Sequence, residues 1–183
     1  VGEVGICRDK ESAGYATEDC QAFRGEIAPL SPIPFMKLGG AMSSIIGAFG
    51  RQDSICGEDA RLCRASLLSA WEATQAATEK WNDRSPACEF TSLHGWEHSY
   101  SVNLSKVHRN VIFRSASVPE LPISSLEAPD AIDLWDRLDA LCTNAGTGCE
   151  VLTIPHNSNV SNGRLFELAW GAESNEEQRR QAA

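Results

Sequence analysis

The sequence contains no run of apolar residues that approaches the roughly 20 needed to cross a bilayer, which excludes a transmembrane helix. It also lacks a surplus of basic residues, since 16 Lys and Arg stand against 25 Asp and Glu for a formal net charge of −9. Nucleic-acid binding requires clustered Lys and Arg, whereas the basic residues here are scattered, so we expect no nucleic-acid partner. Neither an initiator Met nor a basic-then-apolar signal segment stands at the start. We therefore expect an internal part of a longer protein.

The composition is that of a folded globular protein. The 183 residues are 42% apolar and 22% charged, which differs from the low hydrophobicity of disordered chains. A chain of this length could form one domain of ordinary size with a substantial core.

The cysteines contain no C-x-x-C pair, which argues against a structural zinc site. There are nevertheless 7 of them, many for a cytosolic protein of this size. Three pairs have spacings that suit local disulfide loops: Cys7 with Cys20, Cys56 with Cys63, and Cys142 with Cys149. Disulfides predict an oxidising compartment, periplasmic or secreted, with Cys88 as the unpaired thiol. The alternative is a set of reduced, buried cysteines that act as small hydrophobic residues.

The first half of the chain divides into an irregular segment and a long helix. Residues 1–58 are rich in Gly, Pro, Ser and charge, with a short helical candidate at 42–49, and are typical of an insertion or a lid. Residues 60–82 then carry one apolar stripe at steps of three and four residues, which predicts a helix. The stripe consists of Leu67, Ala70, Ala73, Ala77 and Trp81. Pro86 ends this helix, because proline cannot continue it.

The second half alternates candidate strands with helices. Strand-like runs occupy 89–93, 107–114 and 151–155, with a polar loop after the first, and the last reads as a buried strand. Pro129 and Asp130 open a helix between the second and third runs, and a polar, helical tail is expected at 173–183. The buried face of that helix is predicted to consist of Ala131, Trp135, Leu138 and Leu141. The order helix, strand, strand, helix, strand predicts an α/β fold, although three strands are too few to close a barrel.

Each of the three strand regions carries a metal-capable side chain near one end, which suggests a shared site. The candidate ligands are His94, Glu97, His98, His108 and His156. Glutamate and neutral imidazole together suit zinc, manganese or iron. No fixed-offset motif such as H-E-x-x-H is present, so each histidine taken singly could equally be a hydrogen-bonded structural residue.

Polar residues beside these histidines could bind an anionic substrate. Arg109 would project near His108, where a guanidinium could clamp a phosphate or carboxylate, or simply pair with a surface acid. Asn157, Asn159 and Asn162 could hold a substrate through their amides. Asparagines are also the residues that a tight loop requires, so this alternative stays open.

Four long motifs in order resemble a known bacterial family. They are F-T-S-L-H-G-W-E-H-S, H-R-N-V-I-F-R, D-L-W-D-R-L and I-P-H-N-S-N-V-S-N-G-R-L-F, and G-E-V-G-I-C and D-R-S-P-A-C-E-F add to them. Together they cover nearly the whole chain. They resemble the domain of unknown function 3604 (DUF3604) family, which is related to the PHP (polymerase and histidinol phosphatase) metal-dependent hydrolases.

The resemblance implies a fold, a site and a reaction. The fold would be part of a distorted β/α barrel, with residues 1–183 a partial PHP-like domain. A cluster of two or three divalent ions would be held in part by Glu97, His108 and His156. The family's H-x-H, aspartate-histidine pair and D-x-H are missing here, so the chain resembles an internal fragment that is inactive alone.

The reaction implied by the resemblance is hydrolysis of a phosphoester or a similar small anionic ester, with Arg109 steadying negative charge and Asn157 and Asn159 contacting substrate. Two alternatives belong to other functional classes. One is a noncatalytic, disulfide-stapled binding or lid module of a larger secreted protein, in which His108 and His156 would lie far apart or be buried among apolar side chains. The other is a cysteine hydrolase, which needs Cys88 reduced and close to an imidazole.

Overall fold

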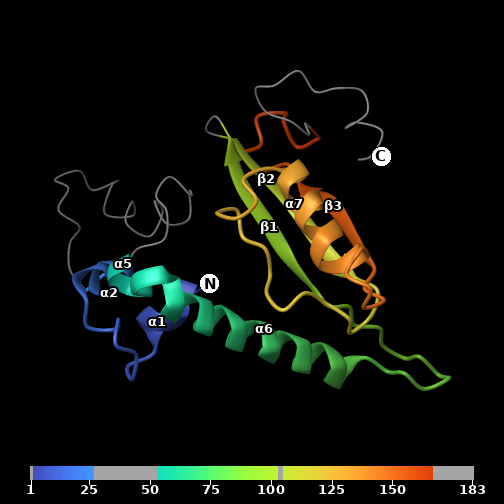
Figure 1. Ribbon diagram of the computed structural model, residues 1–183, viewed down its shortest axis with the longest axis horizontal. Helices are drawn as coiled ribbons and strands as arrows, with labels where there is room; N and C mark the ends of the chain where they lie inside the picture. The colour runs from blue at the N-terminus through green and yellow to red at the C-terminus, as the bar shows by residue number, and fades with distance from the viewer. Residues whose placement is uncertain (1, 27–52, 103–104, 167–183) are drawn as a thin grey trace. The chain divides into compact units, whose positions relative to one another are not determined.

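A computed structural model describes residues 2–26, 53–102 and 105–166 of the chain (Figure 1). The chain forms two compact units, Val1–Ala73 and Thr74–Ala183, and the boundary between them falls inside helix α6 (Arg61–Trp81). The bounds of α6 differ from the predicted 60–82 by one residue at each end, so that prediction is confirmed. The helical candidate at 42–49 and the tail at 173–183 lie outside the described residues.

The first unit is more helical than its composition predicted. Its described part contains α1 (Gly2–Arg8), α2 (Glu18–Phe23), α5 (Asp53–Cys56) and the 3-10 helix η1 (Glu58–Ala60). The expectation of an irregular segment is therefore wrong for these residues. Short helices with little apolar periodicity are hard to see in a sequence, and here disulfides contribute much of their core. That core consists of Ile6, Cys7, Cys20, Ile55, Cys56, Ala60 and Cys63.

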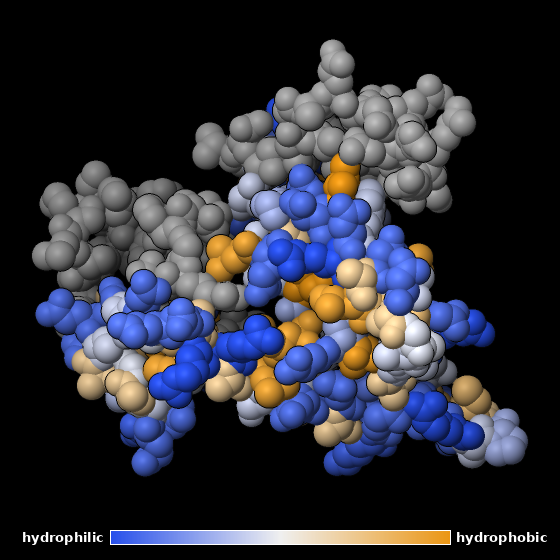
Figure 2. All heavy atoms as spheres, viewed as in Figure 1, coloured by the Kyte–Doolittle hydropathy of each residue, from blue (hydrophilic) through white to orange (hydrophobic). Residues whose placement is uncertain are grey.

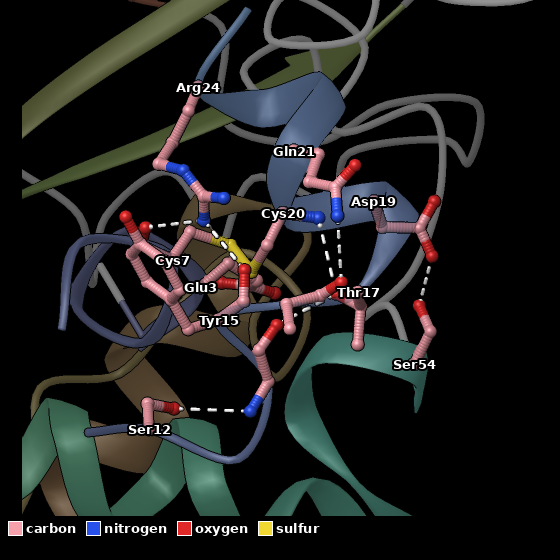
Figure 3. The surroundings of a disulfide bond; sticks show 12 residues. Glu3, Cys7, Ser12, Tyr15, Thr17, Asp19, Cys20, Gln21, Arg24 and Ser54 are labelled. Carbon is pink, nitrogen blue, oxygen red and sulfur yellow. Dashed lines mark hydrogen bonds between the residues drawn. A yellow bond between two sulfur atoms is a disulfide. The ribbon is translucent and has the colours of Figure 1, made fainter. Parts of the chain in front are cut away.

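The disulfide between Cys7 and Cys20 joins α1 to α2 (Figure 3). Thr17 caps α2 by accepting a hydrogen bond from the Cys20 amide at 3.2 Å. Arg24, at the end of α2, donates to the carbonyl oxygens of Cys7 at 3.0 Å and Tyr15 at 2.7 Å. Its guanidinium lies 3.8 Å from the centroid of the Tyr15 ring. A cross-link and one arginine thus hold two helices that are too short to be stable alone.

All three predicted disulfides are present, since Cys56 is bonded to Cys63 and Cys142 to Cys149 as well. Cys88 is free and exposed, as predicted. The pairs fit an extracellular or otherwise oxidising environment. Within the part of the chain that the structure describes, no helix has the length and apolar character that a membrane crossing requires.

The second unit is built on a three-stranded antiparallel sheet in the order β1-β2-β3. The strands are β1 (Gly95–Val102), β2 (Ser105–Phe113) and β3 (Val151–Asn157). Strand β2 confirms the run predicted at 107–114. The strand predicted at 89–93 is wrong, because those residues form no strand and the pairing begins at Gly95, within the predicted polar loop.

Strand β3 extends two residues beyond the predicted run and is not buried on both faces. Leu152 is 60% exposed and Ile154 39% exposed, whereas Val151, Thr153 and Pro155, which alternate with them, are partly buried. A continuous apolar run therefore does not mark a fully buried strand here. The chain forms a mixed α and β structure with an antiparallel sheet.

Helix α7 (Ala131–Leu138) packs on one face of this sheet (Figure 1). Asp130 begins it by accepting hydrogen bonds from the amides of Ile132 and Asp133 at 2.8 and 2.9 Å. The core below it consists of Val111, Phe113, Ile123, Ala128, Leu134, Leu138, Cys142 and Cys149. The face of the described residues that Figure 2 presents is mostly hydrophilic, with smaller hydrophobic areas between the hydrophilic ones.

The predicted buried face of this helix is wrong for one residue, because Leu141 is 50% exposed. The α-helix passes into a π-helical turn, η2 (Asp139–Thr143), and the wider turn rotates the following side chains relative to the stripe. Cys142 is buried in place of Leu141, and Leu134 completes the face one turn earlier.

Candidate functional site

The candidate site lies on the face of the sheet opposite α7. Alternate side chains of a strand point to opposite faces. In β2 the buried residues Val107, Val111 and Phe113 face the core, so His108 between them faces the other way. Ser99 is the residue of β1 directly paired with His108, and Asn157 of β3 is paired with it on the other side.

Glu97, His108 and His156 meet on this face, one from each strand. The Oε1 atom of Glu97 lies 2.8 Å from His108 Nδ1, and its Oε2 atom lies 3.5 Å from His156 Nε2. The centroids of the two imidazole rings are 6.1 Å apart. The side chains of His108 and His156 are 16% and 26% exposed, so solvent and solutes can reach the group. The convergence expected of a shared site is therefore present, while the binding of metal stays a prediction.

Ser99 belongs to the same group, and the sequence analysis missed it. Its hydroxyl donates to Glu97 Oε1 at 2.6 Å and lies 2.8 Å from His108 Nδ1. The hydrogen bond from Ser99 and that from His108 lower the pKa of the Glu97 carboxyl, and burial opposes them only in part. Glu97 is therefore an anion at neutral pH. The signal in the sequence is the two-residue spacing of Glu97 and Ser99, which places both on one face once β1 is recognised as a strand.

The other two histidines are structural. His98 is 1% exposed and faces the α7 side, with Nδ1 3.1 Å from the Ile123 carbonyl oxygen and Nε2 3.0 Å from that of Ala128. Burial lowers the pKa of His98, although these two carbonyl groups act in the opposite direction. His94 is 3% exposed, and its Nε2 lies 2.8 Å from Glu79 Oε1 of α6. Neither belongs to the group around Glu97.

Arg109 does not lie beside His108, so this part of the expected substrate clamp is wrong. It follows His108 in β2 and therefore points to the opposite face, where it is 3% exposed. Its guanidinium carbon lies 5.1 Å from the centroid of the Trp135 ring. Among the residues that the structure describes, no carboxylate forms an ion pair with it, and its Nε has no hydrogen-bond partner.

The asparagines at the end of β3 and after it form turns. The side-chain oxygen of Asn157 accepts a hydrogen bond from the Asn159 amide at 3.2 Å, which is an Asx turn. Asn162 has a φ of 51° and donates to Ser105 Oγ at 3.1 Å. These contacts correspond to the loop-forming role that was the open alternative. Asn157 still lies next to His156 on the exposed end of β3.

The described residues contain one group of three potential ligand atoms that all lie within 4.8 Å of one another, formed by Glu3, Cys56 and Cys63. Its two cysteines are bonded to each other, so they offer no thiolates. Glu97, His108 and His156 do not form such a group, although each of the two imidazoles lies near one oxygen of Glu97. The separation of 3.5 Å between Glu97 Oε2 and His156 Nε2 is close to the edge of a tetrahedron around zinc, about 3.4 Å for bonds of about 2.1 Å. The distance is also that of an ordinary ion pair, so metal binding by these two residues stays a prediction.

Of three comparisons with known proteins, one gave a match, to the model of a protein family. The search of curated proteins gave no match. The search of solved structures gave none either. A family model described as "Protein of unknown function (DUF3604)" matches residues 2–183, and the chain therefore belongs to this family.

Proposed function

We propose that the chain supplies part of the active site of a metal-dependent hydrolase of the PHP type, which acts on a phosphoester or a similar anionic ester. The observation that carries the proposal is the pair formed by Glu97 and His156, with His108 beside it, on one face of the sheet. Membership of the DUF3604 family is compatible with it, and the relation to PHP hydrolases that the sequence motifs imply is part of the proposal. The sheet would then form part of a distorted β/α barrel.

Glu97 Oε2 and His156 Nε2 would hold one ion of zinc, manganese or iron, and His108 would contribute its imidazole to the same cluster. Such an ion would supply Lewis-acid chemistry, since it would lower the pKa of a water toward about 7 and polarise the ester oxygen. The ionised state of Glu97 favours cation binding, because Ser99 and His108 hold its carboxyl deprotonated. Arg109 takes no part in this site.

The cysteine pairs support export of the protein to the periplasm or the outside of the cell. Three disulfides within 183 residues would be hard to maintain among cytosolic reductants. An ion site of imidazole and carboxylate needs no reduced thiol, so it is compatible with this environment.

Metal binding by single-residue variants tests the proposal. Without the ligands that the resemblance places outside these 183 residues, the chain should bind Mn²⁺ or Zn²⁺ weakly and show no esterase activity. Calorimetric titration should show that His156→Ala weakens this binding at least about tenfold, since one of few ligands is lost. Ile154→Ala is the matched control, because Ile154 lies two residues earlier on the same face of β3. Equal affinity of His156→Ala and Ile154→Ala for both ions would contradict the site.

Activity is tested in a longer protein that carries the missing histidines. With added manganese or zinc it should hydrolyse a generic phosphoester such as p-nitrophenyl phosphate. His156→Ala should lower this rate by about 100-fold or more, because a ligand both holds the ion and sets its geometry, whereas Asn159→Ala should do less. Full activity of His156→Ala, or turnover by the 183-residue chain without metal, contradicts the assignment. A noncatalytic module would show neither metal binding nor hydrolysis.

A further inference from the structure

Three polar atoms on the exposed face of the sheet lie within hydrogen-bond distance of one another. They are Ser99 Oγ, His108 Nδ1 and Glu97 Oε1, with separations of 2.6 Å between serine and glutamate and 2.8 Å for each of the other two pairs. Register brings them together, because Ser99 and His108 are directly opposed in β1 and β2 and Glu97 is two residues from Ser99 on the same face.

The protons available to these atoms determine the form of His108. The carboxylate oxygen can only accept, and the serine hydroxyl donates its proton to it. If His108 Nδ1 carried no proton, its lone pair would face the Glu97 oxygen at 2.8 Å, and the two would repel each other. A proton on Nδ1 removes this conflict, since the nitrogen can then donate to Glu97 or to Ser99. The hydrogen bond at one ring nitrogen thus decides which nitrogen keeps its lone pair.

We propose that Ser99 is a positioning residue that, together with Glu97, holds His108 in the Nδ1–H form with its Nε2 lone pair free. Ser99 does so in two ways. Its hydroxyl fixes the rotamer of Glu97 by binding Oε1, and its contact with Nδ1 opposes the ring flip that would put Cδ2 in place of Nδ1 beside the carboxylate. Nε2 is consequently the atom of His108 that would accept a proton or bind an ion. The tautomer itself does not depend on the proposed hydrolase, whereas the consequence for metal binding rests on it.

The serine is suited to this role by its size. Opposed residues of an antiparallel pair have Cβ atoms about 4.5–5.5 Å apart, so a side chain with a single atom beyond Cβ reaches the partner ring without displacing it. Threonine keeps the hydroxyl at the same position and adds only a methyl group. Alanine removes the hydroxyl and leaves the backbone pairing unchanged. These two substitutions therefore separate the hydroxyl from the packing of the strand.

Nitrogen NMR of the imidazole rings in the metal-free 183-residue chain tests the proposal directly. Long-range ¹H–¹⁵N spectra at pH 8 should show His108 with a protonated Nδ1 and an unprotonated Nε2. In Ser99→Ala the two nitrogen shifts should move toward each other, because both tautomers become populated, and Ser99→Thr should restore the original pattern. Ser101→Ala, a change two residues further along the same face of β1, is the matched control and should leave the His108 shifts in place.

A metal titration adds the second readout. Ser99→Ala should weaken Zn²⁺ binding by about tenfold and Ser99→Thr by much less, as is typical of residues that orient a ligand. A wild-type spectrum with the proton on Nε2, or identical His108 shifts in wild type and Ser99→Ala, overturns the proposal. If the wild-type chain binds no metal but the NMR pattern is as expected, the proposed hydrolase site fails while the role of Ser99 stands.

Discussion

Removal of one disulfide should destabilise only the unit that contains it. The loss of stability should depend mainly on the length of the loop that the disulfide closes. Cys142 and Cys149 are separated by 7 positions, and closing a loop of about eight residues lowers the entropy of the unfolded chain by an amount worth about 2.5 kcal/mol. Both sulfurs also pack in the core with Phe113 and Leu134, and these cysteines are 0% and 5% exposed. The double change Cys142→Ala and Cys149→Ala leaves a small cavity, which adds about 1 kcal/mol.

The chain offers a matched control in Cys56 and Cys63. This pair has the same separation of 7, so the loop term is the same, but it lies in the first unit. Hydrogen exchange of peptides from the two units, followed by mass spectrometry, reports the local free energy of opening. The Cys142 and Cys149 double variant should lose about 3 to 4 kcal/mol of protection in β2 and α7 and little in α1 and α2. The Cys56 and Cys63 double variant should show the reverse pattern.

Two results would refute this reasoning. If the Cys142 and Cys149 double variant lost less than about 1 kcal/mol of protection in β2, the contributions assigned to loop closure and to core packing would be wrong. Equal losses in both units from either variant would mean that the units do not unfold separately. As a check on the starting state, alkylation of the unreduced protein should modify Cys88 alone, and 7 alkylatable thiols would contradict the disulfides and the proposed export.

Two further predictions concern the buried polar residues of the second unit. Burial lowers the pKa of His98, so the unfolded chain takes up a proton near pH 6.5 and the folded chain takes it up only at a lower pH. The contribution of His98 to stability should therefore be fully present above about pH 6.5 and should fall as the pH drops toward the folded-state pKa. Thermal melts of His98→Gln over the same pH range should show a weaker dependence of melting temperature on pH. An unchanged dependence would contradict this prediction. Arg109 is a buried cation over Trp135, so Arg109→Met should leave the free energy of unfolding unchanged or raise it by about 1 kcal/mol in denaturant titrations. A loss above about 1 kcal/mol would contradict this, because it would show that the contact with Trp135 stabilises the fold by more than burial of the charge costs.

Local sequence features predicted part of this molecule correctly. Helix α6 follows from an apolar stripe that needs no information from elsewhere in the chain. The three cysteine pairs follow from short separations of 13, 7 and 7 positions, since nearby cysteines meet most readily. The motifs that resemble the DUF3604 family predicted the family correctly, whereas the metal-binding role of Glu97, His108 and His156 stays a prediction.

Other features depended on contacts between distant parts of the chain. Strand β1 begins at Gly95 because that is where it pairs with β2, not because of any local change in composition. Leu141 is exposed because a π-helical turn brings Cys142 into the core, where it is bonded to Cys149. A helix or strand boundary of this kind is set by pairing and packing energies, which the local pattern does not contain.

The site shows the same division between sequence and tertiary structure. The sequence by itself determined which residue types are available: a glutamate and two histidines in three strand regions, and a set of turn-forming asparagines. Tertiary structure decided which of them meet, because the register of the antiparallel sheet places Ser99 opposite His108 and Glu97 diagonal to it. The same alternation carried Arg109 to the opposite face, next to Trp135. A shift of one residue in strand register would reverse every one of these assignments, and register is fixed by the buried face as a whole.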